Sequence, residues 1–158
     1  MWKLPDFFLD LVHRKPGSET QPLPEARATR RQTWLIGVTC YLFFAVLYGA
    51  TVAPSVGMGH DTGELTTVCI LQGIPHSPGY PLFVAIGWLV QQLPIGDEPA
   101  YRLNLLCALE TAIAMGFLGA ALALAFRPIP GLLAALMTGL STAVWRQAVV
   151  TEVFALHL

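Results

Sequence analysis

Residues 34–53 read WLIGVTCYLFFAVLYGATVA and contain no charged side chain. The hydrocarbon core of a bilayer is about 30 Å thick, and an α-helix needs about 20 apolar residues to cross it. A secretory signal peptide has a shorter apolar stretch and a small-residue cleavage site near the N-terminus. Residues 34–53 are therefore predicted to form a transmembrane helix that the mature protein retains.

The composition of the whole chain agrees with a lipid environment. Charged residues make up 12% of the 158 residues, about half of the roughly 25% that is usual for soluble domains, and the mean hydropathy is +0.58. The formal net charge of -1 lacks the clustered basic footprint of a nucleic-acid-binding protein, so no nucleic-acid partner is expected. The three cysteines have no metal or disulfide spacing and are predicted to be small buried hydrophobes: Cys40, Cys69 and Cys107.

Residues 1–33 are polar and are predicted to form a cytoplasmic tail. Because cytoplasmic flanks of transmembrane helices are rich in Lys and Arg, the cations of this segment place the N-terminus in the cytoplasm. Residues 2–12 have an amphipathic pattern, which fits either a helix on the membrane surface or a disordered leader. The cations of the tail are Lys3, Arg14, Lys15, Arg27, Arg30 and Arg31.

Two further transmembrane spans are predicted downstream. Residues 102–126 are rich in Ala and Leu, and residues 131–146 carry small residues that would allow close helix packing. The sequence RPIPG at 127–131 separates the two runs, since proline and glycine interrupt helices. Glu110 is a charge inside the second span, which is costly and suggests function, although it could also snorkel to the interface or pair with Arg102.

Residues 54–101 are predicted to form the first extracytoplasmic loop. The apolar run at 80–93 is about fourteen residues long, which suits an interfacial or re-entrant helix better than a span. If this run crosses the membrane, Glu152 faces the cytoplasm; if it lies at the interface, Glu152 shares a side with Asp61. We favour the interfacial alternative. The predicted fold is therefore an all-α, multi-pass transmembrane protein whose extracytoplasmic loop bears short interfacial helices.

Asp61 and Glu64 are the first candidates for chemistry. Their i, i+3 spacing places both carboxylates on one face if the segment is helical. One acid could serve as a general base toward a hydroxyl acceptor, with its pKa raised by its neighbour and by partial burial, and both could hold a divalent cation. The alternative is structural, since an acid followed three residues later by Glu also fits a capping box at a helix start. The residues alone leave these alternatives open.

His76 and Glu152 are the other candidates. His76 lies in HSPGYP at 76–81, and its imidazole could donate to a phosphate or ligate a metal. The two prolines of this segment fit a helix start. Glu152, with His157 five residues later, could belong to the same site or to a solvated flank. The sequence contains no phosphate-binding loop, nucleophile elbow or zinc signature.

Four motifs in order carry a resemblance to a known family. They read GHDTGEL, HSPGYPLF, YRLNLL and WRQAVVTEVFALH. Their order resembles a family long described as a domain of unknown function, number 2723, and linked to eukaryotic transmembrane O-mannosyltransferases. That family is similar to the GT-C glycosyltransferases, multi-span enzymes that use polyprenyl-phosphate sugars. The chain departs from the family pattern at His60, where an aromatic residue is usual, and at Ser77, where Pro is favoured.

The resemblance implies a site and a reaction. Asp61 and Glu64 would be catalytic, with Asp61 as the base, and a divalent cation is a candidate cofactor at this pair. A sugar such as mannose would pass from a polyprenyl-phosphate donor in the lipid bilayer to a hydroxyl of a protein or glycan acceptor. The implied substrate-binding residues are His76, Tyr80, Arg146, Glu152 and His157.

The resemblance also implies that residues 34–158 are the N-terminal part of a longer GT-C-like domain and inactive alone, because the family's catalytic core extends well beyond this length. The alternative, from another class, is a non-catalytic membrane component of a transport or assembly system. In that case the acids would cap helices and the prolines would mark helix ends.

Overall fold

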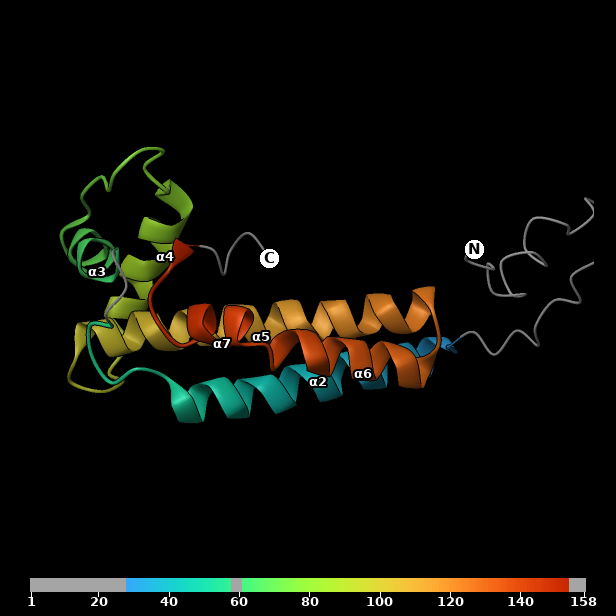
Figure 1. Cartoon of the computed structure of the whole chain (residues 1–158). Helices are drawn as coiled ribbons and strands as arrows, with labels where there is room; N and C mark the ends of the chain where they lie inside the picture. The colour runs from blue at the N-terminus through green and yellow to red at the C-terminus, as the bar shows by residue number, and fades with distance from the viewer. Residues whose placement is uncertain (1–27, 58–60, 154–158) are drawn as a thin grey trace, which may run out of the picture.

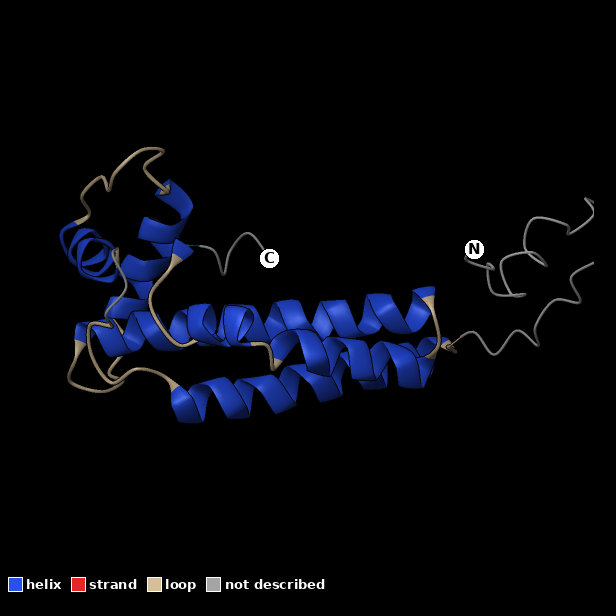
Figure 2. Ribbon diagram, in the orientation of Figure 1, coloured by secondary structure: helices blue, strands red, loops and turns tan. Residues whose placement is uncertain are grey.

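The computed structural model describes residues 28–57 and 61–153. All of the regular structure in these two ranges is helical, in six helices labelled α2 to α7 (Figure 1, Figure 2). The all-α fold class predicted from the sequence is therefore confirmed. The amphipathic segment at 2–12 lies outside the described residues.

Two long helices form the body of the molecule. They are α2 (Arg30–Thr51) and α5 (Pro99–Ala125), and both are long and apolar enough to cross a membrane. Each begins a few residues before its predicted boundary because of a local start signal. Thr29 and Gln32 form a capping box at the start of α2, and Pro99 occupies the first turn of α5, where a missing N–H costs nothing.

Small residues allow α2 and α5 to pack closely along their length. A Cβ placed on Gly116 of α5 would lie 3.0 Å from the carbonyl oxygen of Gly37 in α2. A Cβ on Gly119 would lie 2.7 Å from the Sγ of Cys40. Such close backbone approach is the usual way in which helices associate in lipid, where hydrophobic burial gives no driving force. The aromatic residues Phe44 and Tyr48 of α2 complete this core and are fully buried.

The third predicted span, at 131–146, is divided into two helices. The helices α6 (Pro128–Gly139) and α7 (Thr142–Ala148) meet at an angle of 64°, and together they have the length and composition of one broken span. The bend falls where the hydroxyl of Ser141 accepts a hydrogen bond from the backbone N–H of Val144 and caps α7.

The short helices lie together at one end of the bundle (Figure 1). They are α3 (Thr62–Leu71) and α4 (Pro81–Gln91), which pack on each other and on the beginning of α5. At about 1.5 Å per residue, neither can cross a hydrocarbon core of about 30 Å. A second core joins these three helices and consists of Leu65, Cys69, Phe83, Leu103, Cys107 and Val153. The three cysteines are buried, as predicted.

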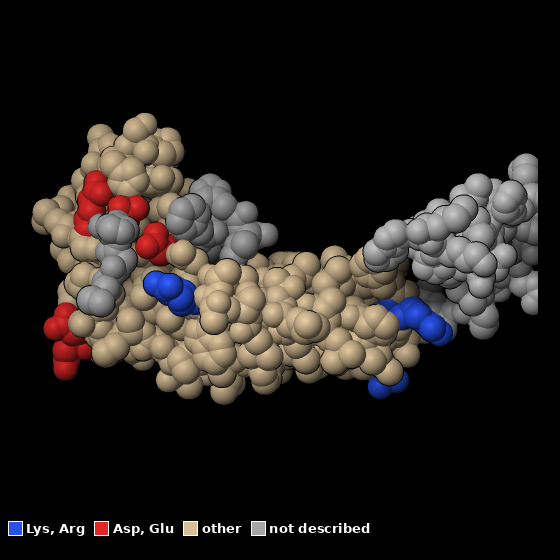
Figure 3. Space-filling view, in the orientation of Figure 1, with Lys and Arg blue, Asp and Glu red and all other residues tan. Residues whose placement is uncertain are grey.

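The two ends of the bundle differ in their charges. The acidic side chains on the face in Figure 3 gather at the end where α3 and α4 lie, with a basic group beside them, and further basic groups mark the end where α2 begins. The turn between α5 and α6, which contains Arg127, lies at that same cationic end (Figure 1). Between the two ends the surface is apolar, with exposed side chains that include Leu35, Val46, Phe117, Leu133 and Met137.

The packing of α6 on α5 can be tested at Gly131. A Cβ at this position would lie 2.5 Å from the backbone nitrogen of Ala123 and 2.7 Å from its Cα. Backbone atoms cannot move aside, so we expect Gly131→Ala to lower the free energy of unfolding by about 1–3 kcal/mol. The matched control is Gly49→Ala in α2, which meets nothing within 4 Å. Thermal unfolding in detergent should show a lower midpoint for Gly131→Ala alone, and equal midpoints would contradict the packing.

Candidate active site at the acidic end

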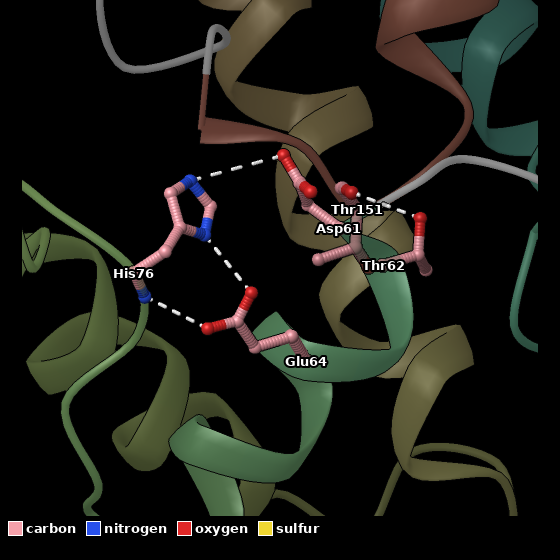
Figure 4. A network of polar contacts seen from close by, with 5 residues as sticks. All are labelled: Asp61, Thr62, Glu64, His76 and Thr151. Atoms are coloured by element: carbon pink, nitrogen blue, oxygen red, sulfur yellow. Dashed lines mark hydrogen bonds and ion pairs between the residues drawn. The ribbon is translucent and has the colours of Figure 1, made fainter.

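Asp61 and Glu64 lie at the beginning of α3, but they do not form the capping box that the sequence left open. Asp61 occupies the N-cap position without a side-chain hydrogen bond to the helix backbone. Glu64, the third residue of the helix, turns instead toward the loop between α3 and α4 (Figure 4). The capping-box alternative is therefore wrong for this pair, although Asp61 is the N-cap residue of α3.

Glu64 binds His76 through both of its carboxylate oxygens. Its Oε1 accepts the backbone N–H of His76 at 2.7 Å, and its Oε2 lies 2.9 Å from the imidazole Nδ1 (Figure 4). The ring of Tyr80 packs edge-on against the imidazole, with 5.5 Å between the ring centroids. Tyr80 also precedes α4 as its N-cap. A single acid thus fixes the loop that connects the two short helices.

The imidazole of His76 lies between two carboxylates. Its Nε2 is 4.0 Å from the Oδ2 of Asp61, on the side opposite Glu64. The hydrogen bonds from His76 lower the pKa of Glu64. The hydrogen bond to Glu64 raises the pKa of His76, and the charges of Glu64 and Asp61 act in the same direction. This arrangement favours a protonated imidazole beside an ionised Glu64.

The same three residues have the donor types of a metal site. One ligand atom from each of Asp61, Glu64 and His76 can be chosen so that all three lie within 4.8 Å of one another. An imidazole ligates one ion through one ring nitrogen, whereas here the two nitrogens face different acids. The cluster can therefore hold a divalent cation in principle, but its present geometry is that of an imidazolium between carboxylates.

Asn104 belongs to the neighbourhood of the site and was not singled out from the sequence. Its side chain is fully buried near the beginning of α5. The amide Nδ2 donates to the carbonyl oxygens of Ala53 at 2.9 Å and Ser55 at 3.0 Å, and Oδ1 accepts the hydroxyl of Thr151 at 2.6 Å. The available signal was a polar amide among the apolar residues of YRLNLL.

The segment that follows α7 lies against the beginning of α3. The hydroxyl of Thr62 donates to the carbonyl oxygen of Thr151 at 3.2 Å (Figure 4), and the thiol of Cys107 contacts the carbonyl oxygen of Glu152 at 3.4 Å. Glu152 therefore lies near the acidic end of the bundle. This is the position expected if residues 80–93 lie at the membrane interface and do not cross the bilayer. Glu152 also takes part in a further interaction.

The remaining predicted site residues are less closely connected with the cluster. Arg146 is exposed in the last turn of α7 and makes no hydrogen bond or ion pair with Asp61, Glu64 or His76 in the part of the chain that the structure describes. His157 lies outside the described residues.

The suggested pairing of Glu110 with Arg102 is wrong. Arg102 donates to the carbonyl oxygens of Ile95 and Gly96, both at 2.8 Å, and so holds the loop before α5. The Oε2 of Glu110 is buried and has no hydrogen-bond partner among the described residues.

A helical bundle with apolar flanks and an acid–histidine cluster at one end defines an integral membrane protein with a polar site at the end of its spans. The N-terminal domain of protein O-mannosyl-transferase TMEM260 matches residues 61–158, and the chain belongs to this family. The family resemblance noted in the sequence is thereby confirmed.

Two curated relatives are similar to the chain. The mouse protein O-mannosyl-transferase TMEM260 is 36% identical over 122 residues, which cover 76% of this chain and 17% of the relative. The Dictyostelium discoideum protein O-mannosyl-transferase tmem260 is 29% identical over 123 residues, which cover 76% of this chain and 15% of the relative. The chain thus spans about a sixth of the length of these relatives. No solved structure matches it.

The charge state of the cluster predicts a pH dependence. Because contact with Glu64 raises the pKa of His76, the ion pair stabilises the loop below the ordinary pKa of histidine, and this stabilisation is lost as the pH rises through the raised value. On the acid side it is lost as the pH falls through the lowered pKa of Glu64. We expect Glu64→Gln to lower the pKa of His76, as measured by NMR titration of ¹³C-labelled histidines.

Two variants make this titration interpretable. His76→Gln identifies the resonance by its disappearance, and Asp97→Asn removes an exposed acid of the neighbouring loop. Asp97→Asn should leave the titration of His76 unchanged. An unchanged pKa of His76 in Glu64→Gln would contradict the contact between the two side chains.

Proposed function

We propose that this chain is the N-terminal part of a membrane glycosyltransferase of the GT-C type. It transfers mannose from a polyprenyl-phosphate donor to a hydroxyl group of a protein acceptor. The names of the relatives support mannosyl transfer to protein. The geometry contributes one observation above all: the carboxylate of Asp61, which accepts no hydrogen bond from any described residue, lies beside the Glu64–His76 pair at the polar end of the bundle.

Asp61 is the catalytic base in this proposal. Both oxygens of Glu64 are bound to His76, whereas the side chain of Asp61 makes no hydrogen bond within the described residues and is 40% exposed. It takes the proton from the acceptor hydroxyl as that oxygen attacks the anomeric carbon of the sugar. The bond from the anomeric carbon to the lipid phosphate breaks, and the configuration is inverted.

Cationic and polar groups near the base bind the donor. His76 carries positive charge when paired with Glu64, so it can offset the charge that develops on the departing phosphate. Arg146 is another cation on this side of the bundle, and the ring of Tyr80 packs against His76. Glu152 is assigned to the acceptor side of the same site.

The proposal requires a definite orientation in the membrane. The start of α2 carries Arg30 and Arg31, and the turn before α6 carries Arg127. The positive-inside rule makes this the cytoplasmic end. The cluster of Asp61, Glu64 and His76 then faces the extracytoplasmic side, which is the lumen in a eukaryotic endomembrane.

The catalytic assignment is tested by isosteric changes in the full-length protein. We expect Asp61→Asn to lower the turnover of mannosyl transfer from a polyprenyl-phosphate donor by about 100-fold or more, as removal of a general base does. Glu64→Gln should cause a smaller loss, because it releases His76 but leaves the base in place. The measurement is the initial rate with radiolabelled donor lipid and an acceptor protein.

The control for this experiment is Asp97→Asn, which removes an exposed acid that lies outside the cluster. It should keep normal turnover. If Asp61→Asn and Glu64→Gln also keep normal turnover, the catalytic assignment is wrong, and a non-catalytic membrane component becomes the better description.

The orientation is tested by cysteine labelling in a background where the three buried native cysteines are replaced by Ala. Gln147→Cys, on the exposed side of α7, should react with a membrane-impermeant maleimide only from the extracytoplasmic side. Arg127→Cys, at the opposite end, should react only from the cytoplasmic side. Labelling of both positions from one side would overturn the proposed topology.

A further inference from the structure

Three segments that are distant in the sequence meet at the carboxamide of Asn104. The first is the chain leaving α2, whose carbonyl oxygens at Ala53 and Ser55 both accept from Nδ2. The second is the chain leaving α7, where the hydroxyl of Thr151 donates to Oδ1. The third is α5 itself, which carries Asn104. With no side-chain exposure, the amide uses both of its N–H donors and its oxygen within the protein.

A second hydrogen bond extends this contact to the proposed base. The carbonyl oxygen of Thr151 accepts the hydroxyl of Thr62 at 3.2 Å, and both threonines are fully buried. Thr62 is the first residue of α3 and directly follows Asp61. The order Asn104, Thr151, Thr62 therefore forms a relay, which passes from the hydroxyl of Thr151 to its backbone carbonyl and ends at the residue next to Asp61. The last contact of the relay, between Thr151 and Thr62, is drawn in Figure 4.

The relay also fixes where Glu152 lies. A backbone hydrogen bond from Ala53 N–H to the carbonyl oxygen of Val149, at 2.9 Å, joins the same two segments that the amide binds. Glu152 directly follows Thr151 and cannot move independently of it. Apolar contacts specify burial, but hydrogen bonds are directional and are strengthened in a medium of low dielectric constant.

We propose that Asn104 is a positioning residue for the reaction. Through Thr151 and Thr62 it holds the Asp61 end of α3 and the segment carrying Glu152 at a fixed separation, so that both acids face one acceptor. This inference rests on the proposed function, because it assigns Asn104 a role in the geometry of that site.

The sharpest test uses Thr151, since it offers an isosteric pair. Thr151→Val removes the hydroxyl that binds Asn104 and keeps the volume, whereas Thr151→Ser keeps the hydroxyl. In the full-length protein we expect Thr151→Val to lower kcat by about 10- to 100-fold, the cost of displacing a catalytic group by about 1 Å, with KM for the donor lipid unchanged. Thr151→Ser should restore most of the kcat.

A second comparison tests the relay itself. Thr62→Val should lower kcat in the same way, and the double variant Thr62→Val/Thr151→Val should lose much less than the product of the two single losses, because both break one path. The matched control is Thr67→Val, an exposed threonine of α3 whose hydroxyl bonds only within the helix, to Gly63. It should keep normal kcat.

The outcomes separate the two proposals. If Asp61→Asn is inactive but Thr151→Val keeps normal kcat, the proposed function stands and the positioning role is overturned. A lower unfolding temperature with normal kcat for Thr151→Val would likewise make the contact purely structural. If Asp61→Asn keeps normal turnover, the proposed function fails first. Asn104→Asp, which loses the donors to Ala53 and Ser55, should resemble Thr151→Val.

Discussion

The close contact between α2 and α5 is the constraint on which the rest of the structure depends. Gly37 and Gly116 leave room for the two backbones to approach closely, and the two helices run antiparallel. The chain that leaves α2 and the chain that enters α5 therefore meet at the same end. Helix α6 then returns along α5, which brings the segment after α7 to that end as well. The polar site is assembled from loops that this packing brings together.

The long helices could be predicted because the bilayer selects for one property, an uninterrupted apolar run. Their first residues could not, since Thr29 and Pro99 act through local start signals that hydropathy does not measure. The bend between α6 and α7 was missed for a related reason. Ser141 is a small residue that suits a continuous packed helix, and only the structure shows that its hydroxyl instead caps a new helix.

The residues of the candidate site could be singled out from the sequence, but the contacts among them could not be predicted. The spacing of Asp61 and Glu64 fits a capping box as well as two carboxylates on one helix face. The choice between them depends on His76, which reaches Glu64 from twelve residues away across a loop. The hydrogen-bond partners of Asn104 lie 47 to 51 residues away in the chain. Such long-range partners leave no local pattern.

The polar side chains at this end of the bundle divide into charged groups that are exposed and neutral groups that are buried, because the free-energy cost of burial differs between them. An ionised side chain loses much free energy when it leaves water, whereas a neutral amide loses little if all of its hydrogen bonds are made. The side chains of Asp61, Glu64 and His76 are accordingly about 40% exposed, and Asn104, Thr62 and Thr151 are fully buried. Neutral hydrogen bonds can thus fix the geometry in the protein interior while the charged groups stay accessible to solvent. The reverse arrangement would neutralise the acids and leave the positioning contacts to compete with water.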